Sequence, residues 1–223
     1  MIYITGDTHG EQSRFIYCQD EKGWGADDTI IVCGDFGYIF EDNYSENRFL
    51  DDLEFRPYTI CFVDGNHENF NALYKYPEEF WNGGRIHRIR KNIIHLMRGQ
   101  IFTIEGKKFF AMGGAYSIDR YMRTENISWW EQELPNNDEY NEAIENLEKN
   151  NMIVDYVITH TAPKEIIYLM KKYPDSHELG LNSFLNYIYF DVEFKHWYCG
   201  HWHIDKEITD KFRTLWFDIN TLE

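Results

Sequence analysis

The chain has 223 residues, the length of one large domain, and 43% of them are hydrophobic, so it can bury a sizeable core. Its 38 acidic residues outnumber 22 Lys and Arg and give a formal net charge of −16. The composition excludes intrinsic disorder, and the charge argues against binding duplex nucleic acid by neutralising many phosphates. We expect a single domain over residues 1–223 without a duplex nucleic-acid partner.

The cysteines and the N-terminal segment indicate a compartment. The four cysteines form no CxxC pair and lie in apolar runs where buried thiols are common, which favours a reducing environment. They are Cys18, Cys33, Cys61 and Cys199. The apolar residues 2–5 are interrupted at once by Gly6 and Asp7, so neither a signal peptide nor a membrane helix of about 18 residues is predicted. We expect a cytoplasmic protein with no membrane partner, and the sequence leaves its oligomeric state open.

Short apolar, β-branched runs alternate with polar or amphipathic segments in the first third of the chain. They cover residues 2–5, 29–33 and 59–63, and each ends in a cluster of Gly, Asp or Asn. This pattern predicts buried parallel strands joined by helical crossovers. Between residues 85 and 112 the runs lie closer together and are separated by short turns, which predicts an antiparallel stretch.

The second half of the chain mixes helical and strand-like segments. Ser128 and Glu131 form a capping box that predicts a helix start, although Pro135 argues against one unbroken helix. Helical spacing returns over residues 138–150, and a strand is expected at 154–159. The later predicted elements are helices at 163–172 and 180–190 and strands at 194–199, 204–209 and 211–217.

Residue types that bind metals follow the predicted strands. Open α/β sheets collect ligands at the carboxyl ends of their strands, so these side chains are expected at one edge. They form five short motifs, namely Gly6-Asp7-Thr8-His9-Gly10, Gly34-Asp35, Gly65-Asn66-His67-Glu68, Thr159-His160 and Gly200-His201-Trp202-His203. Each residue alone has an ordinary structural explanation, such as a helix cap or a turn. Five such placements in one chain favour a metal site.

In this order the motifs resemble those of the calcineurin-like metallophosphoesterase superfamily, whose pattern is DxH, GD, GNH[DE], H and GHxH. The resemblance spans residues 7–203. It implies an α/β fold of the metallophosphoesterase type, an αββα sandwich of two mixed β-sheets flanked by helices. It also implies a centre of two divalent metal ions at one edge of the sandwich.

The resemblance assigns the metal ligands residue by residue. One ion would be held by Asp7, His9, Asp35 and His203, and the other by Asp35, Asn66, His160 and His201, with Asp35 bridging. Two carboxylates against two divalent ions leave the centre positively charged, so it attracts phosphate despite the acidic surface. Mixed carboxylate, imidazole and amide ligands favour Mn²⁺, with iron, zinc and nickel as alternatives.

His67 differs from the other motif histidines because its neighbour Asn66 is the expected ligand. The resemblance implies that His67 is a general acid, since an imidazole titrates near neutral pH and can protonate a leaving alkoxide. The alternative is a histidine that only forms hydrogen bonds within its turn. His87, His95, His177 and His196 are assigned no role.

Two arginines follow a glycine pair at the end of the predicted strand 108–112. Glycines at such a position let the backbone approach a ligand or another chain segment. If the loop after Gly113 and Gly114 leans over the metals, Arg120 or Arg123 would bind substrate phosphate. The alternative is a surface arginine without a partner. The basic stretch 82–104 is interpreted as a solvated face of twisted strands rather than a substrate-facing rim.

The sequence therefore predicts a metallophosphoesterase that cleaves phosphoester bonds with a metal-bridging hydroxide, most simply a small phosphodiesterase or a nucleotide phosphatase acting on a small phosphorylated substrate. A Ser/Thr protein phosphatase or a bis-nucleoside polyphosphatase is the alternative. That branch continues its second motif as Asp-Arg-Gly, whereas Phe36 and Gly37 follow Asp35 here. A weaker alternative is a nuclease that acts on single-stranded or short oligonucleotides.

Overall fold

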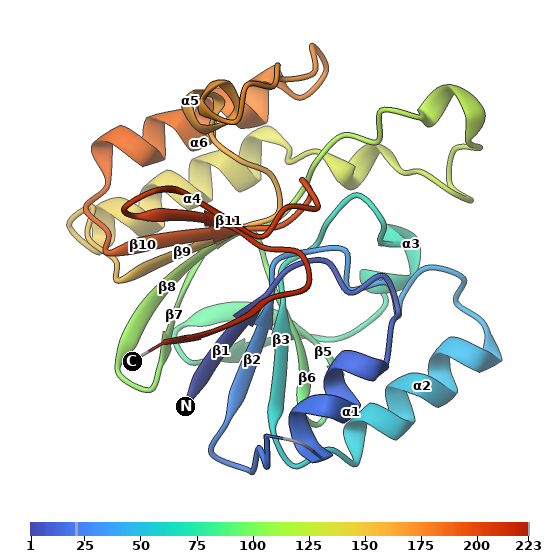
Figure 1. Ribbon diagram of the computed structural model, residues 1–223. Coiled ribbons are helices and arrows are strands. Elements are labelled where there is room, and N and C mark those ends of the chain that lie inside the picture. The colour runs from blue at the N-terminus through green and yellow to red at the C-terminus, as the bar shows by residue number, and fades with distance from the viewer. Residues whose placement is uncertain (21, 223) are drawn as a thin grey trace.

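Two β-sheets pack face to face and carry helices on both outer sides in the computed structural model (Figure 1). The structure describes residues 1–20 and 22–222. Both sheets mix parallel and antiparallel strands, so the predicted αββα sandwich of two mixed sheets is confirmed. In the described part of the chain, no helix is long and apolar enough to cross a membrane.

The first sheet has seven strands in the order β13-β1-β2-β3-β6-β5-β4. Their bounds are β1 Ile2–Thr5, β2 Thr29–Val32, β3 Thr59–Phe62, β4 Glu78–Trp81, β5 Gly84–Arg90, β6 Ile93–Leu96 and β13 Ile219–Leu222. Strands β1, β2, β3 and β6 run parallel, as expected of the first three. Nearly every residue of β1 to β3 is buried, because the strands are covered on both faces.

The second sheet has six strands in the order β11-β12-β10-β9-β8-β7. Their bounds are β7 Gln100–Ile104, β8 Lys107–Met112, β9 Tyr156–Thr159, β10 His196–Cys199, β11 Lys206–Thr209 and β12 Phe212–Thr214. Strands β8, β9, β10 and β12 run parallel, and β7 and β11 are antiparallel edge strands. The carboxyl ends of β9 and β10 therefore point to one edge of the sandwich.

Helices cover the two outer faces, three on each side (Figure 1). Against the first sheet lie α1 Ser13–Asp20, α2 Tyr44–Glu54 and α3 Phe70–Leu73, and against the second lie α4 Asn137–Lys149, α5 Lys164–Leu169 and α6 Leu179–Asp191. The predicted helix at 138–150 is α4, and it begins at a capping box in which the Asn136 side chain accepts the Glu139 N–H.

The apolar core has three layers. The middle layer lies between the sheets and joins side chains from both, such as Ile4 and Ile31 from the first and Phe109 and Ile158 from the second. The outer layers pack each sheet against its own helices. Because both sheets are fixed by this shared core, the ends of their strands are held in one relative position.

Two predictions about the middle of the chain need correction. Residues 85–112 are antiparallel in part, but the chain leaves the first sheet after β6 and enters the second at β7, so they do not form one antiparallel unit. The helix predicted to begin at Ser128 is wrong. Only a 3₁₀ turn forms, η2 Glu131–Glu133, because Pro135 prevents continuation and the Ser128 hydroxyl instead bonds to the Thr124 backbone.

A long loop between β8 and α4 contains a second 3₁₀ turn, η1 Arg120–Met122, and extends outward from the two sheets (Figure 1). We call residues 113–130 the 113–130 loop. It starts at the glycine pair noted in the sequence, where a Cβ on Gly113 would lie 2.3 Å from the Asp64 carboxylate. The backbone at Gly113 therefore lies close to Asp64, which follows β3, and this is the close approach that the glycine pair predicted.

Candidate metal centre

All five sequence motifs meet at one edge of the sandwich. Asp7, Asp35 and Asn66 follow the parallel strands β1, β2 and β3 of the first sheet, whereas His160 and His201 follow β9 and β10 of the second. The carboxyl ends of parallel strands form the usual ligand-binding edge of such sheets. The structure therefore brings together donors that lie up to 196 residues apart, from position 7 to position 203.

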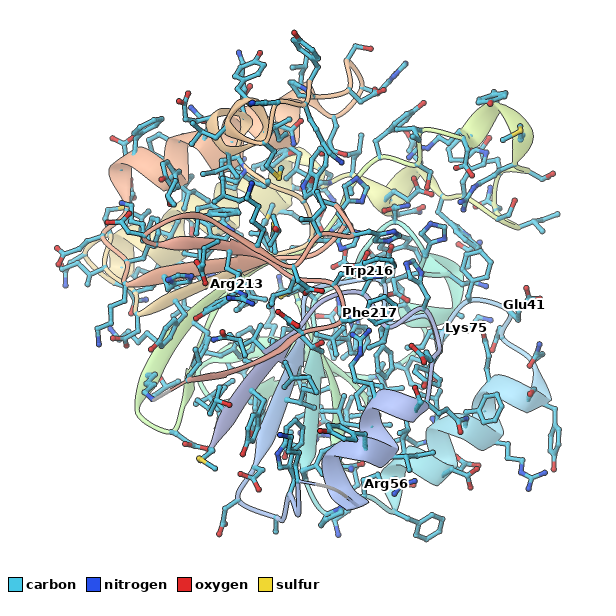
Figure 2. All side chains as sticks on the ribbon, in the orientation of Figure 1. Glu41, Arg56, Lys75, Arg213, Trp216 and Phe217 are labelled. Atoms are coloured by element: carbon cyan, nitrogen blue, oxygen red, sulfur yellow. The ribbon has the colours of Figure 1, made fainter. Side chains whose placement is uncertain are left out.

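Three donors converge on one side of the centre. Nε2 of His203 lies 3.0 Å from Oδ2 of Asp7, and Nε2 of His9 lies 3.7 Å from the same oxygen. The two Nε2 atoms are 3.2 Å apart. The buried Oδ2 of Asp7 receives no hydrogen bond of good geometry, so three ligand atoms surround one point without saturating one another. The His203 ring stacks on Trp216, which is labelled in Figure 2, with ring centroids 5.1 Å apart.

The other side of the centre contains His160 and Asn66. Nε2 of His160 lies 3.4 Å from Oδ1 of Asp35 and 3.2 Å from Oδ1 of Asn66. The second ring nitrogen, Nδ1, is 2.8 Å from the carbonyl oxygen of Cys33, which can only accept a hydrogen bond. Nδ1 therefore carries a proton, and Nε2 is the ring nitrogen that faces the carboxylate and the amide, where a metal ion would take the place of its proton.

Asp35 lies between the two groups. Its Oδ2 is 3.8 Å from Nε2 of His9, and its Oδ1 faces His160. Oδ1 also accepts the backbone N–H of His67 at 2.8 Å, which fixes the carboxylate. Asp7 is fixed in the same way by the backbone N–H of His201, 2.8 Å from its Oδ1. This position fits the bridging role that the resemblance gives to Asp35.

The backbone around the donors is strained and tightly packed. His9, Asp35, His201 and His203 all have left-handed backbone angles, with φ between 45° and 63°. Such angles cost about 1–3 kcal/mol each in ordinary residues and cluster at functional sites. Gly34 permits one of the close contacts, because a Cβ there would lie 2.2 Å from Nδ1 of His160. The chain thus accepts local strain to bring these side chains together.

The electrostatics favour a positive charge at this edge. Burial by itself would raise the pKa of Asp35, but His160, His67 and His9 outweigh it and hold that pKa well below its usual range. Burial would lower the pKa of His160, yet Asp35 and Asp7 outweigh it and raise the pKa to about 10. Donor atoms of two buried carboxylates and three imidazoles converge here, and the Asn66 amide and the His201 ring lie against His160, a donor set that fits divalent cations of the manganese, iron or zinc type.

A cleft of about 570 Å³ opens above the donors. Asp35, Asn66, His201 and His203 line its floor. One wall is the 113–130 loop, and the other is residues 172–178, which we call the 172–178 segment. A larger cavity of about 760 Å³, beside Tyr3 and Trp24, is lined by none of the predicted site residues in the described chain. The smaller cleft is therefore the one that a substrate of the metal centre would occupy.

His67 and Arg123 lie side by side in this cleft. Nη2 of Arg123 is 3.4 Å from Nε2 of His67, while its Nε pairs with Asp119 at 2.7 Å and its Nη1 donates to the Ser128 carbonyl at 3.0 Å. Burial lowers the pKa of His67, and Asp35 partly offsets this effect. Arg123 thus reaches the site from the 113–130 loop and is held by two other contacts of the same loop.

Arg120 lies elsewhere. Its guanidinium donates to the buried Glu133 carboxylate at 2.8 Å and to the Trp130 carbonyl at 3.3 Å. It lines a separate cavity rather than the metal cleft. Of the two arginines considered for substrate binding, Arg123 lies in the metal cleft. Arg120 instead bonds to Glu133 and Trp130.

The basic stretch 82–104 is mostly paired with acidic side chains. Arg85 bonds to Glu78 and Glu142, Arg88 to Glu79, Arg90 to Asp51, and the buried Arg98 to Asp64. None of these arginines lines the metal cleft in the described part of the chain. The stretch is therefore neither a substrate rim nor a simply solvated face.

Two polar residues that the sequence reading did not select support the centre. The Ser117 hydroxyl lies 3.1 Å from Nδ2 of Asn66 and orients that amide so that its oxygen faces His160. The buried Glu178 carboxylate accepts the Tyr116 N–H at 2.8 Å and the Thr161 hydroxyl at 2.7 Å. Neither residue belongs to a motif. The glycine pair before Ser117 was the one available signal, since it marked a close approach at this place.

The family comparison agrees with the geometry of the site. A family model described as calcineurin-like phosphoesterase matches residues 1–205. A search of curated proteins finds no match. Among solved structures, a protein of unknown function from Aquifex aeolicus is similar to 72% of this chain and 80% of its own, with 19% sequence identity and a TM-score of 0.34. On the family match, this chain belongs to the calcineurin-like phosphoesterase family of metal-dependent phosphoesterases.

Proposed function

We propose that the protein hydrolyses small phosphoesters, either phosphodiesters or nucleotides, with two Mn²⁺ ions. The observation that carries this proposal is the convergence of donor atoms from five side chains, with Asn66 and His201 beside His160, next to a cleft that also contains His67 and Arg123. The cleft volume of about 570 Å³ lies in the range of about 300–1,000 Å³ typical of small-molecule sites.

The resemblance divides the ligands into two sets that share Asp35, whereas the two groups of donor atoms that lie within 4.8 Å of one another share Asp7 and comprise Asp7, His9 and His203 and Asp7, Asp35 and His160. We assign Asp7, His9 and His203 to one ion and Asn66, His160 and His201 to the other. When bound, such ions lower the pKa of bound water and neutralise charge on phosphate oxygens. Asp35 would help to hold both ions, and its charge would reduce the repulsion between them.

His67 and Arg123 would act on the substrate itself. The His67 ring belongs to neither donor group and faces the cleft, so it can pass a proton to the oxygen of the leaving group. Arg123 has its Nη2 on the cleft side, and its other contacts hold the guanidinium in place. A guanidinium in this position can bind phosphate oxygens through charge-assisted hydrogen bonds.

The protein phosphatase and bis-nucleoside polyphosphatase alternative is weaker because of Phe36. That branch places a phosphate-binding arginine directly after the bridging aspartate. Here Phe36 is fully buried and stacks on Phe62 with ring centroids 4.5 Å apart, so this position faces the core. We propose that Arg123 supplies the missing cation from a different segment, which separates this protein from that branch. Hydrolysis of single-stranded or short oligonucleotides is the weaker alternative.

A hydrolysis screen tests the proposal. Bis-p-nitrophenyl phosphate, p-nitrophenyl phosphate, nucleotides and a phosphopeptide are each incubated with metal-free protein and with protein reloaded with Mn²⁺. We expect hydrolysis of the small esters after reloading only, and little release of phosphate from the phosphopeptide. Full activity in verified metal-free protein would overturn the proposal. Preference for the phosphopeptide would favour the protein phosphatase alternative. Reloading the metal-free protein with Fe²⁺, Zn²⁺ or Ni²⁺ in place of Mn²⁺ ranks the metals by the activity that each restores.

A further inference from the structure

The two walls of the metal cleft touch through a pair of stacked rings. Tyr116 belongs to the 113–130 loop and His177 to the 172–178 segment, 61 positions later in the chain. Their ring centroids are 4.6 Å apart and their planes are inclined by 11°. We call this contact the Tyr116–His177 bridge. It connects the loop that follows β8 with the segment that joins α5 to α6.

The bridge stands between two cavities. On one side is the metal cleft of about 570 Å³, and on the other is a cavity of about 540 Å³ lined by residues such as Tyr74, Leu134 and Pro135. Tyr116 lines both cavities, whereas His177 lines the second cavity and its neighbours Ser176 and Glu178 line the cleft. The stacked rings therefore separate two spaces that would otherwise adjoin.

Both halves of the bridge are held in place. The Tyr116 N–H donates to the buried Glu178 carboxylate at 2.8 Å, and the Arg120 guanidinium lies 4.3 Å from the Tyr116 ring centroid. Oδ1 of Asp175 lies 2.9 Å from Nδ1 of His177 and accepts the His177 backbone N–H at 2.8 Å. Glu178 is itself fixed by Thr161 and Asn182. These contacts make the bridge a formed wall rather than a chance meeting of two mobile side chains.

We infer that the Tyr116–His177 bridge is a specificity determinant that confines the substrate to the metal cleft and excludes phosphoesters carried on a longer chain. The inference rests on the proposed function and narrows it. A substrate the size of one nucleotide fits within the cleft, whereas a longer chain that entered along the line of the two cavities would meet the stacked rings. A barrier of this kind discriminates by a clash with the wrong substrate rather than by added contacts with the right one.

The test compares two substrates that share one reacting group. One is thymidine 5′-(p-nitrophenyl phosphate), and the other is a tetrathymidylate that carries the same p-nitrophenyl phosphate at its 5′ end. The wild-type protein with Mn²⁺ is expected to hydrolyse the mononucleotide with much the higher kcat/KM. His177→Ala removes the ring from a side chain that is 64% exposed and lies outside the metal cleft, so the fold and the mononucleotide rate are expected to persist.

His177→Ala should raise kcat/KM for the tetrathymidylate by about tenfold or more, the order by which a small steric change alters substrate discrimination. His177→Phe keeps a flat ring against Tyr116 and should preserve the wild-type preference. Equal wild-type rates on both substrates, unchanged discrimination in His177→Ala, or relaxed discrimination in His177→Phe would each overturn the inference. Absence of hydrolysis of both substrates by the wild-type protein would instead contradict the phosphodiesterase form of the proposed function, on which the inference rests, so the two failures are distinguishable.

Discussion

The metal donors stand on the ends of buried strands, whereas the walls of the cleft stand on two segments outside the sheets. Asp7, Asp35 and Asn66 follow strands that are almost fully buried, and the shared core fixes both sheets relative to each other. Tyr116 and His177, in contrast, lie on the 113–130 loop and the 172–178 segment. Reactive groups need exact placement, which the ends of buried strands supply. Loops can vary in sequence without disturbing the sheets, so they can alter which substrate the protein binds.

Because the donors lie at strand ends and the walls lie on loops, substitutions in the two regions should have different effects. Changes at strand ends should alter metal content and abolish activity on every substrate. Changes in the walls should alter the preference among substrates and leave the metals bound.

Asp35→Asn should reduce hydrolysis of all substrates to the level of metal-free protein. The substitution removes the carboxylate that lies between both donor groups and leaves the repulsion between two divalent ions less compensated. Metal analysis after dialysis should find fewer than two ions in each chain. Asp7→Asn is the matched variant, since Asp7 is assigned to one ion and its loss should weaken mainly that site. Two tightly held ions in Asp35→Asn would contradict the bridging role.

His67→Ala should separate substrates by their leaving group. A general acid contributes about 10²–10⁴-fold when an alkoxide departs, so hydrolysis of an alkyl or nucleoside ester should fall by that order. A p-nitrophenolate is stable as an anion and should leave almost as well without a proton. Both ions should remain bound, because the His67 ring belongs to neither donor group.

The measurement for His67 compares single-turnover rates of the two ester types, so that the chemical step is observed in both. A variant that loses both activities to the same extent would show that His67 positions the phosphate or shapes the metal centre. The acid role would then have to be withdrawn.

Arg123→Ala should act on the substrate and spare the metals. Loss of a charge-assisted contact is worth about 1.5–3 kcal/mol, which lowers kcat/KM by about 10- to 150-fold. Arg120→Ala is the comparison within the same loop, because that side chain pairs with the buried Glu133 instead of facing the metal cleft. It should lower the thermal unfolding temperature more than it changes catalysis. Unchanged kinetics in Arg123→Ala would remove it from the site.

The sequence predicted at which edge of the sandwich the donor side chains meet, because the information that places them is local. Each donor follows a strand by one to four residues, and the apolar runs that mark those strands are continuous since both faces are buried. Strands β4 and β13 were missed because most of their side chains are exposed or only half-buried, so neither contains a continuous apolar run. The helix expected at Ser128 failed because Pro135 outweighed the capping signal.

The cleft walls could not be predicted in the same way. The contact between Ser117 and Asn66 joins residues 51 positions apart, and the Tyr116–His177 bridge joins residues from two loops. Neither pair produces a periodic pattern in the sequence, because each contact forms only when loops from distant parts of the chain meet in the folded protein. The glycines before the 113–130 loop indicated a close approach but not its partner, which is Asp64.

Substitution of Ser117 should have the smallest effect. It also tests most sharply the division between strand ends that hold metals and walls that select substrates, because Ser117 belongs to a wall but contacts the expected metal ligand Asn66. Its hydroxyl lies 3.1 Å from Nδ2 of Asn66 and keeps the amide oxygen turned toward His160. Removing a partner that orients a metal ligand costs about 10- to 100-fold in affinity or activity, and Ser117→Ala should lie near the lower end because water can replace a hydroxyl.

The expected result is weaker binding of one ion, measured as a shift in the Mn²⁺ concentration that restores half of the activity, with maximal activity recovered at high Mn²⁺. Ser117→Thr keeps the hydroxyl and should restore the wild-type metal dependence. If Ser117→Ala lowered activity equally at every Mn²⁺ concentration, the residue would act on the substrate as part of the wall. If Ser117→Ala changed metal affinity alone, the 113–130 loop would be shown to serve both functions: Arg123 would bind the substrate, and Ser117 would orient the amide of Asn66.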